Sequence, residues 1–221
     1  MKVLNSEKEP YKSYGGFGVD VAERRTDDID KKILEHLRGK SEPRVLDLGS
    51  GAGGQSFRMV EAGAFVTAID IYDFSNEFAE YRKSQNVDEE RLKFIYGDIT
   101  KISEYLTSEK FTDVSMQRTL HYLPYLEAVE LLTFLRTIVS DKLFISVTGM
   151  NSAVGDNYGG REVAIESRFI KLEPVEADIF QILAPVCLYT EDEFVTLLKK
   201  TGWEVEEVWQ SAFGNIKAIC R

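Results

Sequence analysis

The hydrophobic residues of this chain recur in two alternating patterns, one with the spacing of a helix and one with that of a strand. In residues 27–37, apolar side chains recur every three or four positions after an acidic start, and Gly39 follows. This spacing predicts an amphipathic helix. Further helical patterns cover residues 55–62, 76–85, 102–106 and the stretch from Pro124 to 138, and apolar runs of strand type lie between them at 44–48, 64–70, 92–96, 113–116 and 142–147. Strands that alternate with helices in this way predict a parallel sheet covered on both faces.

The pattern changes after residue 148. Residues 149–187 have no regular period and are too long for an ordinary loop, so they form either a functional cap or structure that the pattern does not reveal. A helix over 191–201 and strands at 203–208 and 216–220 follow, and these strands predict a terminal hairpin. The expected fold is therefore α/β, a doubly wound, mostly parallel seven-stranded sheet with helices on both faces and a C-terminal antiparallel hairpin. No linker or repeat divides the chain, so residues 1–221 are interpreted as one domain.

Composition and charge narrow the classes of partner. The chain carries 27 basic and 37 acidic side chains, a net charge of −10, and has no basic stripe, which argues against binding to nucleic acid or anionic lipid. Its two cysteines and two histidines lack the spacing of a disulfide framework or a zinc site, so no metal is expected. Without a secretory signal or an apolar run long enough to span a membrane, a cytoplasmic protein is predicted. Nothing in the sequence predicts an oligomeric state.

A glycine-rich loop follows the first predicted strand. Gly49, Gly51 and Gly53 lie at a strand-to-helix turn, which is where an open α/β sheet binds its ligand. Glycine allows the ligand to approach the backbone closely because no Cβ intervenes. Gly49, Gly51 and Gly54 also have the G-x-G-x-x-G spacing of a dinucleotide binder, so the glycines alone leave two kinds of ligand open.

Two carboxylates near this loop bear on the choice. Asp47 precedes Gly49 by two residues, where it would repel a phosphate but attract an ammonium or sulfonium group. The alternative is that Asp47 only caps local backbone N–H groups. Asp70 ends the next strand, where a carboxylate can accept hydrogen bonds from both ribose hydroxyls of any nucleoside ligand.

Four elements in this order resemble the class I S-adenosylmethionine-dependent methyltransferases, a Rossmann-like family. They are Asp47-x-Gly49-x-Gly51-x-Gly53, Asp70 at the end of the second strand, Gly97-Asp98-Ile99 after the third, and the segment DVSMQRTLHYL at 113–123. The final helix and the hairpin that begins at Gly202-Trp203 are also similar to the family, and the resemblance covers residues 29–148 and 189–221.

The resemblance implies a cofactor, S-adenosylmethionine, with S-adenosylhomocysteine as its product, and a role for each matching residue. At the methionine portion, Gly49, Gly51 and Gly53 would lie along the chain of the ligand, Asp47 would lie near its ammonium, and Gln117 would approach it. Asp70 would bind the ribose. At the adenine, Ile71 would pack on one face, and Asp98 and the Ile99 N–H would bind the edge. Asp98 has an alternative interpretation as an ordinary turn residue after a strand. The many relatives with an amino-terminal lid suggest the same role for residues 1–28.

Methyl transfer from a sulfonium is an in-line displacement in which the cofactor carries the activated group, so the protein need supply only alignment and, at times, a base. His121 is the candidate base, unless it shapes the loop before the next helix. Tyr11 and Tyr14 would close over the ligands, or are ordinary surface aromatics. Tyr158 and Arg161 would meet the substrate, or are solvated loop residues.

The sequence also argues against some acceptors. Enzymes that methylate adenine or glutamine amides have an Asn/Asp-Pro-Pro-aromatic segment where this chain has QRTL at 117–120, and the Pro-Cys nucleophile of cytosine-C5 enzymes is absent. We therefore expect transfer to a small molecule covered by residues 1–28 and the insertion at 149–187. The alternatives are a protein methyltransferase, an NAD(P)-dependent oxidoreductase and a non-catalytic cofactor-binding module.

Overall fold

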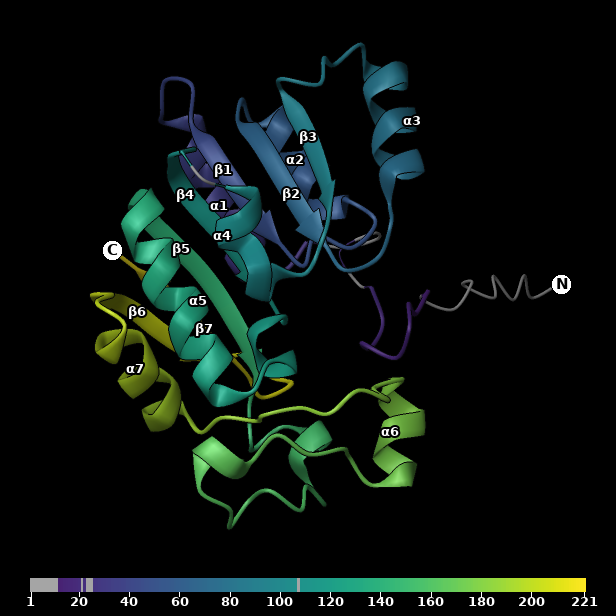
Figure 1. Ribbon diagram of the computed structural model, residues 1–221, viewed down its shortest axis with the longest axis vertical. Coiled ribbons are helices and arrows are strands. Elements are labelled where there is room, and N and C mark those ends of the chain that lie inside the picture. Colours follow the sequence, from purple (N-terminus) through teal and green to yellow (C-terminus); the bar gives the residue numbers. More distant parts are fainter. Residues whose placement is uncertain (1–11, 21, 23–25, 107) are drawn as a thin grey trace, which may run out of the picture.

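A single mixed sheet organises the molecule. The computed structural model describes residues 12–20, 22, 26–106 and 108–221 (Figure 1). Seven strands follow the order β3-β2-β1-β4-β5-β7-β6, with bounds β1 Arg44–Leu48, β2 Phe65–Asp70, β3 Leu92–Tyr96, β4 Phe111–Gln117, β5 Val139–Thr148, β6 Val205–Gln210 and β7 Asn215–Cys220. Strands β1 to β5 run parallel, and β7 pairs antiparallel with both β5 and β6. The predicted fold class is confirmed.

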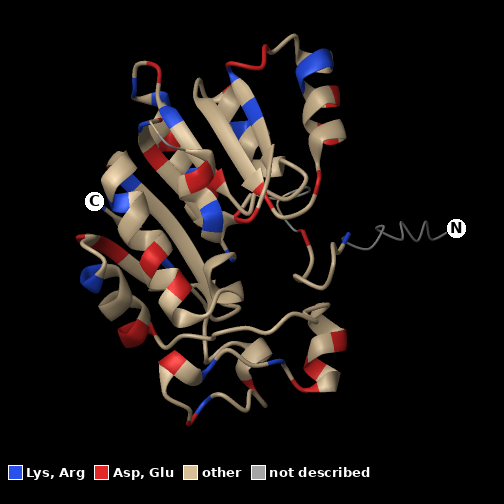
Figure 2. Ribbon diagram, in the orientation of Figure 1, with Lys and Arg blue, Asp and Glu red and all other residues tan. Residues whose placement is uncertain are grey.

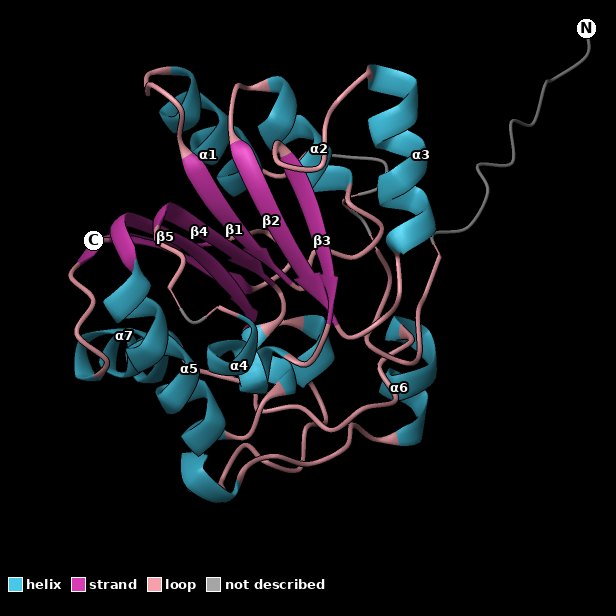
Figure 3. Cartoon of the chain, turned by 45° about the horizontal axis from the view of Figure 1, so that its top comes forward, coloured by secondary structure: helices cyan, strands magenta, loops and turns pink. Residues whose placement is uncertain are grey.

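Helices cover both faces of this sheet (Figure 3). One apolar cluster lies under α1 (Asp28–Arg38), α2 (Gly54–Glu61) and α3 (Ser75–Gln85), and another lies under α4 (Ile102–Tyr105), α5 (Tyr125–Ile138) and α7 (Glu191–Lys200). Strand β1 contributes to both clusters, because Val45 belongs to the first while Leu46 and Leu48 belong to the second. A strand with both faces buried explains the nearly continuous apolar run in its sequence.

The helix termini follow rules that the sequence already displays. Asp27 caps α1 and forms a capping box with Asp30, and Thr190 and Glu193 form the same arrangement at α7.

Each of the helices α1 to α7 carries at least one acidic residue, and acidic and basic positions are interspersed over the ribbon in Figure 2. Within the described part of the chain, no helix is long and apolar enough to cross a membrane.

The insertion at 149–187 has structure that its sequence pattern did not reveal. It contains the 3-10 helices η3 (Ala153–Gly155) and η4 (Ile165–Ser167) and the helix α6 (Pro174–Phe180). Buried residues of the insertion, together with Leu188 just after it, form a third apolar cluster, made of Met150, Tyr158, Leu172, Ile182, Val186 and Leu188, whereas Cys187 belongs to the cluster under α5 and α7. The insertion therefore packs around an apolar cluster distinct from the two on the sheet.

Residues 12–20, here called the N-terminal strap, lie against this insertion (Figure 1). The Gly18 N–H donates to the Gln181 carbonyl at 2.8 Å, and the Leu183 N–H donates to the Gly16 carbonyl at 2.7 Å. These bonds bring together two segments that are more than 160 residues apart in sequence, at the end of the sheet where β1, β2 and β4 terminate.

Candidate functional site

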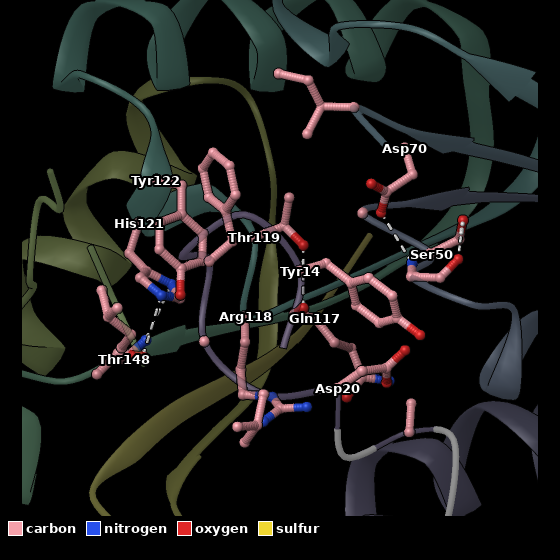
Figure 4. A pocket seen from close by; sticks show the side chains of 18 of the residues that line it. Tyr14, Asp20, Ser50, Asp70, Gln117, Arg118, Thr119, His121, Tyr122 and Thr148 are labelled. Atoms are coloured by element: carbon pink, nitrogen blue, oxygen red, sulfur yellow. Dashed lines mark hydrogen bonds between the residues drawn. The ribbon is translucent and has the colours of Figure 1, made fainter. Parts of the chain in front are cut away.

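A cavity of about 680 Å³ opens at the carboxyl ends of β1, β2 and β4 (Figure 4). Strand β1 pairs with β2 on one side and β4 on the other, so the cavity lies where the strand order reverses, the usual ligand site of an open α/β sheet. The strap contributes Tyr14, Phe17 and Asp20 to the lining, and the insertion contributes Phe180 and Ile182. Three parts of the chain that are distant in sequence thus enclose one space.

The glycine loop forms one wall of the cavity, although not with all three predicted glycines. Gly49 has φ 69° and Gly51 has φ 55°, and both line the cavity. A Cβ at Gly49 would clash with Thr119, and one at Gly51 would lie 2.5 Å from Asp20 Oδ2. Gly53 differs from the prediction because it does not line the cavity. It caps α2 with φ 91°, and a Cβ there would clash with the ring of Phe57, so helix packing requires this glycine.

Asp47 is buried beneath this loop and lines the cavity. Ser56 donates a hydrogen bond to Asp47 Oδ2 at 2.5 Å. Burial raises the pKa of Asp47 to about 7, since a carboxylate loses hydration there, and the bond from Ser56 opposes that shift. A cation placed nearby would favour the charged form, so the site is suited to an ammonium group.

Asp70 ends β2 and holds the loop in place. Its Oδ2 accepts the Gly51 N–H at 2.8 Å and its Oδ1 accepts the Tyr72 N–H at 2.9 Å. Burial raises the pKa of Asp70, and the two backbone bonds oppose this. Each carboxylate oxygen has a second lone pair, so Asp70 can also accept hydrogen bonds from two hydroxyl groups of a ligand in the cavity.

The part of the cavity predicted to bind adenine contains both polar and apolar residues. Asp98 caps η1 (Ile99–Lys101), with Oδ1 accepting from the N–H and the hydroxyl of Thr100, both at 2.9 Å. The turn role considered for Asp98 is therefore real, and Oδ2 accepts no hydrogen bond within the described part of the chain. Ile71 and Ile99 also line the cavity, and Ile71 is 49% exposed. An aliphatic side chain this exposed offers a surface for a flat ring.

Gln117 reaches the cavity at the end of β4, as predicted, but its amide is engaged. Its Nε2 donates to Asp30 Oδ1, and the other oxygen of Asp30 accepts the Asp27 N–H at 2.6 Å. The amide is thereby fixed against the first turn of α1. Gln117 can contact a ligand only with its remaining polar atoms.

His121 lies in the wall of the cavity, and it is almost completely buried, with 1% of its surface exposed. The Thr148 N–H donates to Nδ1 at 3.4 Å, so Nε2 carries the proton and faces Thr148 Oγ1 at 3.3 Å. Burial, with the charge of Arg118, lowers the pKa of His121 to about 3. The ring is therefore neutral near pH 7 with Nδ1 already accepting, which is a poor arrangement for the predicted base.

The four residues predicted to meet the substrate fall in different places. Tyr11 lies outside the described residues. Tyr14 lines the cavity and packs edge-on against Phe74, with ring centroids 4.8 Å apart. Tyr158 does not line it, because its hydroxyl is buried in the insertion, where its one proton is shared between the carbonyls of Arg168 and Val186. Arg161 does not line it either, and donates to the carbonyls of Met150 and Gly155, both at 2.9 Å.

Other lining residues were not predicted. Asp20 of the strap accepts the Ala52 N–H of the glycine loop at 3.1 Å, and Tyr122 packs edge-on against Phe17 with centroids 5.0 Å apart. Arg118 follows β4 directly and extends into the cavity (Figure 4). The sequence shows glycines at 15, 16 and 18 before Asp20, and Arg118 beside Gln117, but neither pattern indicates which way a side chain points.

Comparisons with known proteins agree on a fold family. Residues 39–154, more than half of the chain, match the family described as a methyltransferase domain. The structure is similar to the 1,6-didemethyltoxoflavin-N1-methyltransferase of Burkholderia thailandensis, solved with its substrate and S-adenosylhomocysteine, at 19% identity and a TM-score of 0.66 over 91% of this chain and 78% of that one. A methyltransferase from Clostridium acetobutylicum is similar at 10% identity and a TM-score of 0.66, over 87% and 89% of the two chains.

The chain spans only part of some larger relatives. An O-methyltransferase family protein from Burkholderia thailandensis is similar at 13% identity and a TM-score of 0.61, over 87% of this chain and 56% of that one. No curated protein matches the chain in sequence. At these identities, the solved structures establish the shared fold.

Proposed function

The chain belongs to the class I S-adenosylmethionine-dependent methyltransferase family, and on that premise we propose that it transfers the methyl group to a small molecule bound in the described cavity. The observation that carries the proposal is the clustering of Asp47, Asp70 and Asp98 at three strand ends around one cavity. The family's cofactor is a cationic nucleoside with a charged amino-acid tail, and these carboxylates suit its positive and hydroxyl-bearing parts.

The cavity also has the polar groups that such a cofactor would need. Gln55 lines the cavity, and its Nε2 is buried with no hydrogen-bond partner within the described part of the chain, whereas its Oε1 accepts from Arg58 Nε at 3.0 Å. Buried polar groups are normally satisfied, so an unpaired amide nitrogen beside a cavity indicates a ligand that accepts from it. Ile71 is exposed and offers an apolar surface that a ligand in the cavity could cover.

We assign the binding roles as follows. Asp47 and the backbone of Gly49 and Gly51 hold the methionine portion, Asp70 holds the ribose hydroxyls, and Ile71, Ile99 and Asp98 hold the adenine. When bound, the cofactor supplies an activated methyl group, which leaves with the in-line attack of the acceptor. The chain's own residues align the acceptor and exclude water.

The acceptor would occupy the part of the cavity between the strap and the insertion. Phe17, Tyr122, Phe180 and Ile182 line this part, and no element of the sheet supplies them. We propose that the strap, as part of the predicted lid at 1–28, and the insertion at 149–187 cover the acceptor. The main-chain bonds between Gly18 and Gln181 and between Leu183 and Gly16 support a joint role.

For His121 we propose a positioning role in place of proton transfer. Its neutral ring fixes Thr148 at the end of β5 and packs against Tyr122, with ring centroids 4.2 Å apart. A substitution at His121 should therefore act through the shape of the acceptor wall.

Calorimetric titration with S-adenosylhomocysteine tests the proposed cofactor site. The wild-type protein should bind it and should not bind NAD(P). In Asp70→Asn, the lost charge should weaken binding by about 1–3 kcal/mol, or roughly 5- to 150-fold, because hydrogen bonds to a charged acceptor are replaced by weaker ones.

The matched control is Asp192→Asn, an exposed carboxylate on α7 that does not line the cavity and should leave affinity unchanged. Binding of NAD(P) in preference to S-adenosylhomocysteine would refute the proposal. Equal affinity of the Asp70→Asn variant and the wild type would remove Asp70 from the ribose site.

A further inference from the structure

The backbone of Arg118 has a conformation that is unusual for any residue other than glycine. It follows the last residue of β4 and has φ 51°, in the left-handed region that side chains with a Cβ rarely adopt. Its N–H is held by Ser146, donating to the carbonyl at 2.9 Å and to Oγ at 3.1 Å. Strained backbone of this kind persists where the surrounding structure requires a particular side-chain direction. Here that direction is into the cavity (Figure 4).

The guanidinium of Arg118 has no hydrogen-bond or ion-pair partner among the residues that the structure describes. By contrast, the buried cations Arg168 and Lys217 are paired with Glu193 at 2.7 Å and with Asp27 at 2.7 Å. Arg118 is only half-buried in the cavity wall, and partial loss of hydration lowers its pKa. Its guanidinium therefore presents donors to the cavity that an anion could accept from.

The acidic residues near Arg118 already have other partners. Asp30 binds the Gln117 amide and the Asp27 N–H, and Asp20 accepts the Ala52 N–H. Among the described residues that line the cavity, Arg118 is the single Lys or Arg, whereas seven lining residues are acidic: Asp20, Asp27, Asp30, Asp47, Asp70, Asp98 and Glu127. A positive charge kept in such surroundings, yet bonded to none of them, is available to a ligand.

We propose that Arg118 binds the anionic group of the acceptor, a carboxylate or a similar planar anion carried on an aromatic or otherwise flat molecule. This inference rests on the proposed function and names its substrate class. The planar fork of a guanidinium matches two carboxylate oxygens. The rings of Tyr122 and Phe17, 5.0 Å apart, provide the flat apolar surface in the same cavity.

The cofactor's own carboxylate is the other possible source of an anion. The glycine-loop side of the cavity already has an unpaired donor for it, the Gln55 amide nitrogen. In Figure 4 the guanidinium of Arg118 lies well away from Asp70, the proposed ribose ligand. These observations favour the acceptor as the source of the anion that Arg118 binds. The test must still detect binding of the cofactor's carboxylate to Arg118.

The test uses the full chain saturated with S-adenosylhomocysteine and two probes of the same shape, benzoate and benzamide, titrated by NMR. The wild type should bind benzoate about tenfold or more tightly than benzamide, because charge-assisted hydrogen bonds are the stronger kind. Arg118→Met should abolish this preference without weakening benzamide, and Arg118→Lys should retain part of it. Arg44→Met, at the opposite end of β1 and outside the cavity, is the matched control and should keep the full preference.

Each alternative has its own signature. Equal binding of benzoate and benzamide by the wild type, which needs no variant, would overturn the inference. So would an Arg118→Met variant that keeps the preference and binds S-adenosylhomocysteine less tightly but 5′-methylthioadenosine normally, since only the first ligand carries the amino-acid tail. Failure of the wild type to bind S-adenosylhomocysteine at all would instead refute the proposed function. Thermal melts establish that each variant is folded.

Discussion

The buried His121 should make the folded protein sensitive to acid. Its pKa is about 3 in the folded state against a usual value of 6.5, so below pH 6.5 the unfolded chain binds a proton that the folded chain does not. The stabilisation from the neutral ring is fully present above pH 6.5 and is lost as the pH falls from there toward 3. At pH 5, which is 1.5 units below 6.5, the loss is about 2 kcal/mol at 1.36 kcal/mol per unit.

Asp47 changes stability in the opposite direction. Burial raises its pKa from 3.8 to about 7, so its contribution is present below pH 3.8 and is lost as the pH rises through 7. The two effects oppose each other between about pH 4 and 6.5, and the wild-type curve alone would hide both. The informative quantity is the difference in unfolding free energy between wild type and His121→Gln.

Urea unfolding at pH 8 and pH 5 measures this difference. His121→Gln should be less stable than the wild type at pH 8, and its deficit should shrink by about 2 kcal/mol at pH 5. NMR gives a direct check, because the chain has only two histidines and the variant spectrum assigns them. A constant difference across this range, or a His121 signal that titrates near pH 6.5, would refute the argument and restore this residue as a candidate base.

Three further substitutions test the packing of the glycine loop, the sheet and the insertion. Gly49→Ala would place a Cβ against Thr119 at φ 69° and should cost about 2 kcal/mol or more in urea unfolding, whereas Gly39→Ala, with φ −85° and 3.7 Å to the nearest atom, should be nearly neutral. Asp113→Asn should cost about 3–5 kcal/mol of unfolding free energy at pH 7, because it breaks the buried ion pair with Lys40. Burial raises the pKa of Asp113, but its hydrogen bonds lower that pKa overall, so the deficit should diminish as the pH falls below 3.8. Tyr158→Phe should lose about 1–3 kcal/mol of stability with unchanged affinity for S-adenosylhomocysteine, and a loss of affinity at full stability would return Tyr158 to the substrate site.

Element boundaries could be predicted where turn residues interrupt the hydrophobic pattern. Strands Arg44–Leu48 and Leu92–Tyr96 have the predicted bounds, since each is a short apolar run with polar residues or glycine beside it. The start of β5 was missed by three residues. Helix α5 ends at Ile138 and the strand begins at Val139, with no loop or turn residue between them to mark the change.

The candidate site was predictable in the part that local sequence determines. A residue at the end of a parallel strand lies at one edge of the sheet whatever else the chain does, and Asp47, Asp70 and Gln117 all line the cavity. The pairing of the strap with the insertion was not predictable, because it depends on contacts between distant segments with no common period. The direction of Arg118 was also hidden, since a positive φ at a residue other than glycine leaves no trace in the sequence.

The two halves of the cavity come from different parts of the chain, and this division has a consequence for specificity. The methyltransferase family matches residues 39–154, which contain the glycine loop and the three strand-end carboxylates. The strap and most of the insertion lie outside that match, and they supply Phe17, Phe180 and Ile182 to the opposite wall. Because the cofactor is common to the family while acceptors differ, the segments outside the match are free to vary with the acceptor. Arg118 lies inside the match and lines the same cavity, and we expect it to act with Phe17 and Tyr122 in selecting the acceptor.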